Sequence, residues 1–430
     1  MIPNSSTLAF DTTARGTKRR VLIAGDCIIP PGDPALRLGP DLEERIRSAD
    51  LSVVNLEAPI TNAPQAIEKS GPLKHSAPTT PRLLSDVGFD AVTLANNHIM
   101  DYGRPGLART VEGCSEAGMS STGAGNTLSQ AFEPLVAECG GNTVSVLNLC
   151  EREFGIASDH SPGTAWIGHP SIESRIDSIC SDSELVIVIV HGGIEYVPFP
   201  PIHLQDRFRS LIDRGVDVVI GHHPHVPQGW EAYHDGAIIY SLGNFLFRQA
   251  REQTRWGLTA DLVLDEDGSA GIEIVPTILR DGTVVEMEGA LRRKHLEHLE
   301  QLSSLTQEDL MAHWQAQAVR VFENRYAEWL TKGVGALPRQ FLDHPSHVID
   351  TCARWDESAD HLVLLNLLRN ESHQALIQTA LEIKTGNRSD LRTPEVERTV
   401  TERLAWTDRT EQNPSLGLWR AMQRLLSRWQ

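Results

Sequence analysis

The stretch VVIGHHPHVPQG, residues 218–229, places three histidines within four positions directly after an apolar run. The run is rich in β-branched residues and predicts a buried strand, so the histidines follow its carboxyl end. Two interpretations are open: a metal site, or a histidine-rich surface turn. His223 and His225 lie two apart around Pro224, and in an extended segment such residues project to the same side, so they could share a site. His222 would then point the other way and pack or support the site.

The same strand pattern recurs upstream, with helix-like segments between the strands. The other apolar runs are RVLIAG (20–25), LSVVNL (51–56), DAVTLA (90–95), TVSVLNL (143–149) and ELVIVIV (184–190), and VDVVIG (216–221) leads into the histidines. In the intervening segments 41–49, 106–118 and 204–215, apolar residues recur at three and four positions. This order predicts an α/β fold whose central strands, apolar on both faces, are covered by helices.

The pattern changes twice further along the chain. From Gly236 to about Glu288, short apolar runs separated by D-G pairs predict an antiparallel portion that completes the sheets. From residue 291 the sequence is helical up to a stop at Gly386, and the polar stretch 387–412 is expected to be a weakly structured link. We therefore expect three parts: an N-terminal extension (1–19), a main domain (20–290) and a mostly helical module (291–430).

Composition narrows the classes of partner. The formal net charge of -18 argues against a nucleic-acid or anionic-membrane surface, because clustered Lys and Arg recruit such partners. The N-terminus has no signal-peptide pattern and no apolar run approaches the ~20 residues of a membrane helix, so we expect a soluble, cytoplasmic protein. The six cysteines form no C-x-x-C pair, as is typical of reduced thiols. Oligomeric state is left open.

Side chains with metal-ligand chemistry follow five of the predicted strands. They are Asp26 after the first strand, Asn55 and Glu57 at the second, Asn96, Asn97, His98 and Asp101 after the third, His191 after the fifth, and His222, His223 and His225 after the sixth. Taken singly, a Gly-Asp pair is typical of a turn or helix cap, and a lone strand-end His is commonly structural. Together they meet at the carboxyl edge of the strands, where open α/β sheets bind ligands.

The ligand types indicate the kind of metal. Asp, Glu, Asn and His supply oxygen and imidazole without thiolate, which suits Mn, Fe or Zn in a hydrolytic site. The set is large enough for two ions with a bridging carboxylate. Two such ions, ~3.5 to 4 Å apart, can generate a hydroxide and stabilise charge on an attacked carbonyl or phosphoryl group.

Six stretches in order also resemble a known family. They are GD (25–26), NLEAPI (55–60), GFDAVTLANNHIMDYG (88–103), HGGIEY (191–196), GHHPHVPQGWE (221–231) and YSLGNFLF (240–247). The chain resembles the CapA-type poly-γ-glutamate capsule-synthesis family, whose domain is similar to the calcineurin-like metallophosphoesterases. The resemblance covers about residues 20–290. It implies an α/β sandwich of the four-layer α/β/β/α type, here with a C-terminal helical extension.

The resemblance also implies roles for individual residues. Asp26 and His225 would hold one metal and Glu57 would bridge, while Asn97, His191 and His223 would hold the second. His98 would protonate the leaving group or stabilise the oxyanion, oriented by Asp101. Four other residues would line the pocket or support the ligands: Glu195, Tyr196, Glu231 and Asn244.

The chain departs from the family pattern at two points. Calcineurin-like enzymes usually carry D-x-H in the first motif, whereas Asp26 is followed here by Cys27 and Ile28, so one histidine ligand of the first metal is absent. The following CIIPPGDP replaces the segment with Gly and Arg that is common after the GD, which weakens the claim of a shared substrate. Many family members carry an N-terminal membrane anchor and work beside a capsule synthase, whereas this chain shows no such segment. We therefore expect a small-molecule or peptide-like substrate rather than a role in polymer export.

Three functions remain open at this stage. One is a hydrolase or acyl-transfer enzyme acting on an amide, for example a γ-glutamyl or other peptide-like amide, with a metal-bound hydroxide. The second is a phosphoesterase that uses the same two-metal site, and the third is a non-catalytic component of poly-γ-glutamate synthesis. Arginines and lysines that converge on the metals would favour a phosphate or carboxylate-rich substrate. The candidates are Lys74, Arg104, Arg152 and Arg248.

Overall fold

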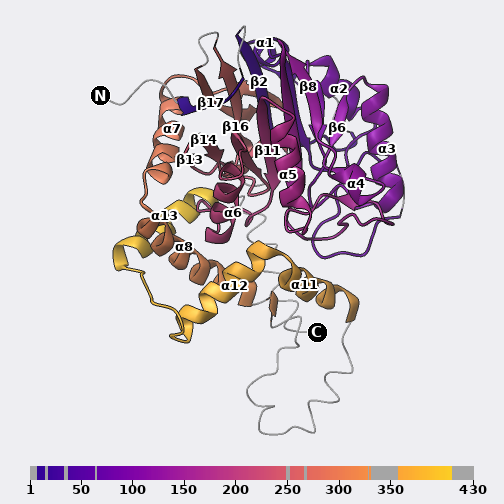
Figure 1. Cartoon of the computed structure of the whole chain (residues 1–430). Helices are drawn as coiled ribbons and strands as arrows, with labels where there is room; N and C mark the ends of the chain where they lie inside the picture. The colour runs from indigo at the N-terminus through magenta and orange to yellow at the C-terminus, as the bar shows by residue number, and fades with distance from the viewer. Residues whose placement is uncertain are drawn as a thin grey trace.

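The protein is a mixed α/β molecule, and most of the helices after Gln307 gather at one end (Figure 1). The structure, a computed structural model, describes residues 7–14, 18–32, 37–62, 65–247, 252–265, 269–327, 329–330 and 357–408. The predicted α/β class is confirmed.

The larger of two main sheets has a parallel half and an antiparallel half that meet at β2 (Arg19–Ile28). On one side β4, β5 and β6 follow in parallel; on the other, β16, β17 and β18 form an antiparallel ladder. Strand β15 runs parallel to β2, while β1 pairs with β17 and β3 with β18. The bounds are β1 (Thr7–Phe10), β3 (Arg37–Leu38), β4 (Leu51–Leu56), β5 (Ala91–Thr93), β6 (Ser120–Thr122), β15 (Asn244–Phe247), β16 (Trp256–Leu264), β17 (Ala270–Arg280) and β18 (Thr283–Glu286).

The smaller sheet has six strands in the order β13-β14-β12-β11-β9-β8, and its centre is parallel. A further two-stranded sheet joins β7 to β10. The bounds are β7 (Ala124–Gly125), β8 (Leu135–Cys139), β9 (Asn142–Cys150), β10 (Gly163–Thr164), β11 (Leu185–His191), β12 (Val218–His222), β13 (Trp230–Tyr233) and β14 (Gly236–Ile239). All six strands predicted before residue 222 are present, at positions close to those expected.

Successive side chains of a strand point to opposite faces of its sheet, and they therefore belong to different layers of the core. In β2, Val21 and Ile23 join a cluster shared with β9 and β11 of the smaller sheet, whereas Leu22 and Ala24 face a cluster with α1, α2 and α3. The outer face of the smaller sheet packs in the same way on α5 and α6. The helix bounds are α1 (Pro40–Arg47), α2 (Thr80–Asp86), α3 (Gly103–Glu116), α4 (Leu128–Ala131), α5 (Ile172–Ser181), α6 (Ile202–Ile212) and a 3-10 turn η1 (Glu252–Arg255). Side chains on both faces of the central strands are therefore buried, as predicted.

The expected antiparallel portion after Gly236 is only partly antiparallel. The run GAIIYSLGNFLF forms two short strands, β14 and β15, which pair in parallel with β12 and β2 of different sheets. The turn between them crosses from one sheet to the other at Gly243, whose φ is 66°. The runs on either side of the D-G pairs are antiparallel neighbours as predicted, β16 with β17 and β17 with β18, whereas the partner of β15 is β2, far away in the sequence.

The C-terminal part is helical, with one difference from expectation. Its elements are α7 (Gly289–Ser303), α8 (Gln307–Val321), the π-turn η2 (Phe322–Tyr326), α11 (Glu357–Arg369), α12 (Glu371–Lys384) and α13 (Pro394–Asp408). The helix stop at Gly386 is confirmed by its φ of 74°. The expectation of a weakly structured link at 387–412 is wrong for 394–408, because α13 buries Val400 and Leu404 against the core; residues 409–412 lie outside the described part.

Candidate metal centre

The predicted ligands come from the ends of strands in both sheets. Asp26 is brought into place by a bulge in β2, where the pairing with β4 shifts between Ala24 and Asp26. A side chain at Gly25 could not fit, because a Cβ there would lie 2.2 Å from the carbonyl oxygen of Gly243. The bulge thus turns a fully buried carboxylate toward the gap between the sheets.

The histidine stretch is a turn and not an extended segment. His223 and His225 have φ values of 97° and 59°, in the left-handed region that side chains with a Cβ rarely adopt. The alternation argument for this pair is therefore wrong, although both rings are buried and lie at the site. His222, the last residue of β12, supports the site as expected: its Nδ1 lies 2.9 Å from Asp26 Oδ1. Backbone strain held by a rigid core is a common property of ligand-binding turns.

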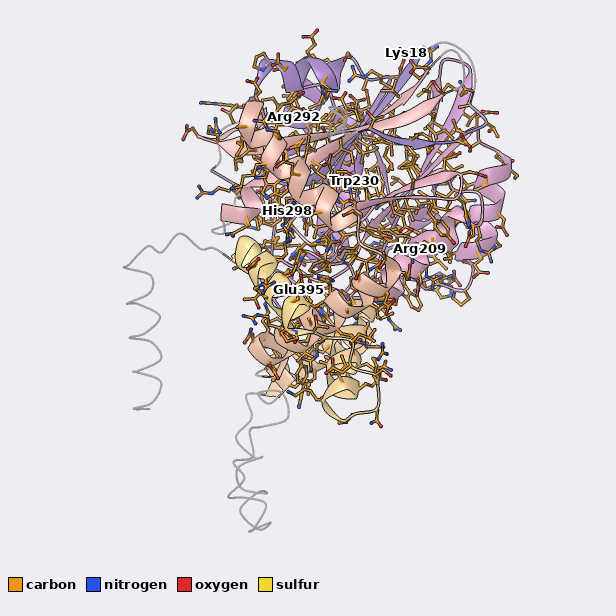
Figure 2. The ribbon with its side chains drawn as sticks, turned by 90° about the vertical axis from the view of Figure 1, so that its left-hand side faces the viewer. Lys18, Arg209, Trp230, Arg292, His298 and Glu395 are labelled. Atoms are coloured by element: carbon orange, nitrogen blue, oxygen red, sulfur yellow. The ribbon has the colours of Figure 1, made fainter. Side chains whose placement is uncertain are left out.

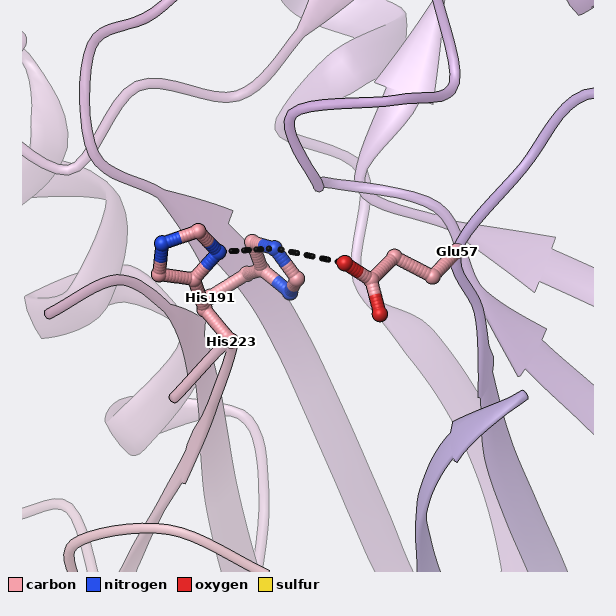
Figure 3. A group of neighbouring side chains, drawn as sticks. All are labelled: Glu57, His191 and His223. Atoms are coloured by element: carbon pink, nitrogen blue, oxygen red, sulfur yellow. Dashed lines mark hydrogen bonds and ion pairs between the residues drawn. The ribbon is translucent and has the colours of Figure 1, made fainter. Parts of the chain in front are cut away.

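Two groups of potential ligands share one carboxylate. Glu57, His191 and His223 form one group, and Asp26, Glu57 and His225 the other; within each group the ligand atoms lie within 4.8 Å of one another. Figure 3 shows the first group, in which His191 Nε2 lies 3.6 Å from Glu57 Oε1 and 3.1 Å from His223 Nδ1. On the other side, His225 Nε2 lies 3.7 Å from the same Glu57 oxygen.

Glu57 provides a test of whether the site fits cations. Its side chain is fully buried, and within the described part of the chain neither of its oxygens has a hydrogen-bond partner. A buried carboxylate without hydrogen bonds is costly unless a cation compensates it. Asn97 Oδ1 adds a further oxygen, 3.2 Å from His191 Nε2. The donor set of carboxylates, imidazoles and an amide is compatible with divalent metal binding.

The pKa values of the candidate ligands are shifted because these groups are buried and lie close to one another. Burial raises the pKa of Glu57 well above its usual range, and the nearby Asp26 charge adds to this. Burial would also raise the pKa of Asp26, but the hydrogen bonds with His222 and His225 outweigh it and the pKa lies well below its usual range. Burial lowers the pKa of His223 to about 4. For His225, Glu57 and Asp26 overcome burial and raise the pKa to about 9.

Amide side chains orient the ligands. Asn244 Oδ1 lies 3.0 Å from His225 Nδ1, while its Nδ2 donates to the carbonyl of Thr254. Asn55 Nδ2 donates to Asp26 Oδ1 at 2.7 Å and lies 3.3 Å from His191 Nδ1. Asn244 thus has the supporting place that was predicted for it, and Asn55 has a similar one.

The predicted catalytic pair forms part of a triad of polar side chains. His98 Nδ1 lies 2.8 Å from Asp101 Oδ2, and Lys69 Nζ contacts Asp101 and lies 3.2 Å from His98 Nδ1. Burial and the Lys69 charge lower the pKa of His98 to about 4, against the opposing effect of Asp101. The imidazole is therefore neutral near pH 7. Lys69 was not among the predicted site residues, because it follows no strand and its segment carries no motif.

A cavity of about 360 Å³ opens next to this triad. Asn97, His98, Glu195 and His223 line it, which places Glu195 in the pocket as predicted. Tyr196 adopts a φ of 62° and its ring centroid lies 5.7 Å from that of His225. Glu153 also lines the cavity and was missed from the sequence; burial raises its pKa to about 7.

Glu231 is not brought to the site. It lies on β13, where it pairs with Arg209 at 2.9 Å and accepts a hydrogen bond from Tyr240, and these three residues line a different, smaller cavity. Arg209 and Trp230, which both line this second cavity, are labelled in Figure 2. The motif placed Glu231 only nine residues after His222, but β13 carries it away along the sheet edge.

Of the cations proposed as anion-binding candidates, Lys74 is near enough for its charge to act on Glu57, whereas Arg104 and Arg152 lie at the surface. Arg104 and Arg152 are exposed, and Arg152 lies over the ring of Trp166. Lys74 lies over Phe247, with Nζ 5.3 Å from the ring centroid. Arg248 lies outside the described residues. Lys69 and Arg325 are instead the cations that line the cavity.

The central part of the chain is similar to known bacterial capsule synthesis proteins. Residues 37–249 match the family described as bacterial capsule synthesis protein PGA_cap. The chain is 29% identical over 223 residues to the capsule biosynthesis protein CapA of Bacillus anthracis, covering 50% of this chain and 54% of that protein. It is 30% identical over 249 residues to the PGA biosynthesis protein CapA of Bacillus subtilis strain 168, covering 56% and 65%. The chain thus spans between half and two thirds of these relatives.

Two solved structures from Thermus thermophilus show partial similarity. A hypothetical protein is 17% identical with a TM-score of 0.38, covering 60% of this chain and 98% of that chain. A 5'-nucleotidase precursor is 13% identical with a TM-score of 0.36, covering 72% and 68%. Within the described part of this chain, no helix combines the length and apolar character needed to cross a membrane.

Proposed function

We propose that this chain, which belongs to the family of the bacterial capsule synthesis protein PGA_cap, is a metal-dependent enzyme that hydrolyses an amide or transfers its acyl group. The observation that carries the proposal is the Glu57 carboxylate, buried without a hydrogen-bond partner among the described residues and shared by two groups of ligands. Burial disfavours the charged form of this carboxylate and raises its pKa, so ionising it in the metal-free protein costs stability. Cations at both groups would remove this cost.

The chain's own residues divide into two sets around the shared carboxylate. Asp26, Glu57 and His225 would hold one divalent ion; Glu57, His191 and His223, with Asn97, would hold a second. Mn, Fe and Zn all suit such ligands. When bound, these ions would supply electrophilic activation of the scissile group and of an attacking water.

We assign proton transfer to His98, which lines the cavity together with Asn97 and His223. A neutral imidazole whose Nδ1 faces Asp101 can accept a proton at Nε2 and pass it to a leaving nitrogen. Asp101 holds the ring and would stabilise it when charged. Burial and then the Lys69 charge oppose protonation of His98 and lower its pKa, which would keep the ring neutral between turnovers.

The charges of the cavity favour an amide over a phosphoester. Two cations, Lys69 and Arg325, line it together with two carboxylates, Glu153 and Glu195, and Lys69 is already paired with Asp101. Arginine is the residue best suited to bidentate recognition of phosphate, and Arg325 is the one arginine in the described lining of this cavity. Peptide-like and other small amide substrates are therefore the proposed class, in a cytoplasmic setting without nucleic-acid partners.

The calcineurin-like, four-layer α/β/β/α assignment of the main domain is part of the same proposal. The packing of α1 to α3 on one sheet and of α5 and α6 on the other supports it. In that arrangement the two sheets face each other, and ligands from both can meet at one edge.

A substrate screen with defined metals tests the proposed reaction. The protein is stripped, reloaded with Mn, Fe or Zn, and assayed against γ-glutamyl and other amide chromogens and against p-nitrophenyl phosphates. Metal-dependent release from amides, abolished in Glu57→Gln, is the expected result. Glu231→Gln serves as the matched control, since this carboxylate pairs with Arg209 away from the ligands and its loss should leave the metal content unchanged.

The other outcomes of the screen identify the alternatives. Turnover confined to phosphate esters would assign a phosphoesterase. Full metal loading without turnover of any substrate would point to a non-catalytic role in poly-γ-glutamate synthesis, and absence of metal from the reloaded protein would overturn the proposed centre itself.

A further inference from the structure

The C-terminal helices form the outer wall of the cavity beside the candidate metal centre. Arg325 and Tyr326 of η2, Leu367 of α11 and His373 of α12 all line it, opposite Asn97, His98 and His223. These helical residues lie outside the segment 37–249 that matches the family. The wall is therefore a feature of this chain that the family match does not describe.

The first turn of α12 is fixed to the main domain by buried polar contacts. Ser372, fully buried, donates from Oγ to Glu151 Oε1 at 2.8 Å. The other oxygen of Glu151 accepts the backbone N–H of Gly193 at 2.8 Å, two residues after His191. Next to Ser372, Glu371 accepts the indole N–H of Trp166 at 2.6 Å. One carboxylate thus joins the helix to the loop that begins at His191.

A second connection ties η2 to the same loop. Arg325 Nη1 donates to the carbonyl of Glu195 at 3.0 Å, and the Arg325 guanidinium lies over the ring of Tyr196 at 5.9 Å. Tyr326 and His373 are joined at 2.6 Å between the hydroxyl and Nδ1, so η2 and α12 are also held together. The wall therefore has a defined position relative to the candidate ligands.

The lining of this wall combines apolar side chains with a cation. Val363, Leu367 and Trp329 provide an apolar surface, and the Trp329 side chain is unusual for its size in being 39% exposed. Arg325 lies within the same lining, only partly buried, and a guanidinium presents several N–H groups in a fixed plane. The other lining residues include the imidazoles of His98 and His223 and the carboxylates of Glu153 and Glu195, together with Lys69 and residues 70–72.

We infer that this wall is a substrate-selecting subsite for an apolar side chain that lies next to a carbonyl or carboxylate oxygen, as in an acylated amino acid or a short peptide. Trp329, Val363 and Leu367 contact the apolar side chain, and Arg325 donates to the oxygen. The inference rests on the proposed function for the direction of the substrate, with its amide toward His98. It adds that selectivity comes from the helical module and not from the metal-binding loops.

Direct binding tests the subsite without requiring turnover. Four probes that share one carboxylate are used: N-acetylated glycine, alanine, leucine and phenylalanine. Their dissociation constants are measured by ligand-observed NMR on the full chain, both stripped of metal and loaded with Mn. We expect the leucine and phenylalanine probes to bind about tenfold more tightly than the glycine probe, because burial of their side chains adds to the affinity.

Variants of the wall identify the residues responsible. Trp329→Ala and Val363→Ala should remove most of the preference for apolar probes, and Arg325→Gln should weaken all four. Gln378→Ala, on the exposed face of α12 where Gln378 pairs with Glu382, is the matched control and should keep the preference. Thermal unfolding of each variant shows whether the fold is retained.

The results separate this inference from the proposed function. A preference for apolar probes that disappears in Trp329→Ala supports the subsite even if no amide is hydrolysed. Equal binding of all probes, absence of binding, or a preference that survives in both folded apolar-wall variants overturns the subsite, whatever the outcome of the activity screen.

Discussion

Asn244 determines which nitrogen of His225 faces the carboxylate that the two ligand groups share. Its Oδ1 lies 3.0 Å from His225 Nδ1, and its Nδ2 donates to the Thr254 carbonyl, so the amide orientation is fixed. The ring then presents Nε2, which lies 3.7 Å from Glu57 Oε1. Asn244, which is not itself a candidate ligand, thus orients the ring of the candidate ligand His225.

Asn244→Ala is expected to weaken metal binding about 10- to 100-fold, because the His225 ring loses the contact that selects its tautomer and orientation. Mn titration by calorimetry measures the effect. Asn126→Ala, an exposed asparagine in a loop, serves as the control and should bind Mn like the unaltered protein. Equal affinities for the two variants would contradict the orienting role.

Glu57→Gln is expected to have opposite effects on the metal-free and metal-loaded protein. The pKa of Glu57 is raised in the folded state, so the stability of the metal-free protein is highest at acidic pH and falls as the pH rises through that pKa. A neutral amide removes this loss, and we expect a gain of about 1 to 3 kcal/mol in metal-free stability at pH 7. Denaturant unfolding measures it.

The same variant should lose the increase in melting temperature that divalent ions give the unaltered protein, since ligands that bind only the native state stabilise it. If metal raised the melting temperatures of the variant and the parent equally, the shared-ligand role of Glu57 would be excluded.

His98→Gln is expected to lower turnover by about 10²- to 10⁴-fold while the metal content stays unchanged, because proton transfer is lost but no ligand is removed. Elemental analysis and steady-state kinetics on the same preparation measure both. Unchanged turnover would remove the proposed role of His98.

Lys69→Met is expected to raise the pKa of His98, which the Lys69 charge and burial now hold at about 4. The charged form of His98 is disfavoured in the folded state, so the acidic limb of its titration should move to higher pH in the variant. NMR titration of the His98 ring measures the shift directly. A pKa that stays the same or falls would show that Lys69 does not control the protonation of His98.

Ser372→Ala is expected to lower the free energy of unfolding by about 1 kcal/mol, since Glu151 loses one of its buried donors. The larger consequence should be faster proteolysis of the C-terminal helices, because this contact joins α12 to the main domain. Ser174→Ala, an exposed serine of α5, should show neither effect. Identical proteolysis rates in the two variants would argue that α12 does not depend on Ser372 for its attachment.

Much of the fold could be predicted because its signals are local. The β-branched runs at 51–56 and 184–190 are largely apolar, and they become strands buried on both faces. The helix ending at Gly386 was likewise indicated by its terminal glycine, which adopts the left-handed conformation that other residues resist. The polar composition after it was misleading, because a few apolar residues, among them Val400 and Leu404, are sufficient to bury one face of α13.

The sequence indicated which residues could serve as ligands, but not the backbone conformation that brings them together. Strand-end positions indicated Asp26, Glu57, His191 and the histidine turn, since parallel strands bring their carboxyl ends to one edge. The positive φ values of His223 and His225 could not be anticipated from alternation, because the turn is held by contacts with distant residues. Lys69 and Glu153 carry no sequence signal; they reach the cavity only because their loops pack beside Asn97.

By itself, the sequence determined which side chains end the strands and therefore which chemistry is available: carboxylate, amide and imidazole without thiolate. Only the tertiary structure decided that Lys69 joins His98 and Asp101, that Glu231 pairs with Arg209 elsewhere, and that α11 and α12 form the outer wall of the cavity. The physical reason is the distance along the sequence over which each kind of interaction acts. Periodicity and turn preferences act over a few residues, whereas the contact between Glu151 and Ser372 joins positions 221 residues apart and depends on how complete layers pack.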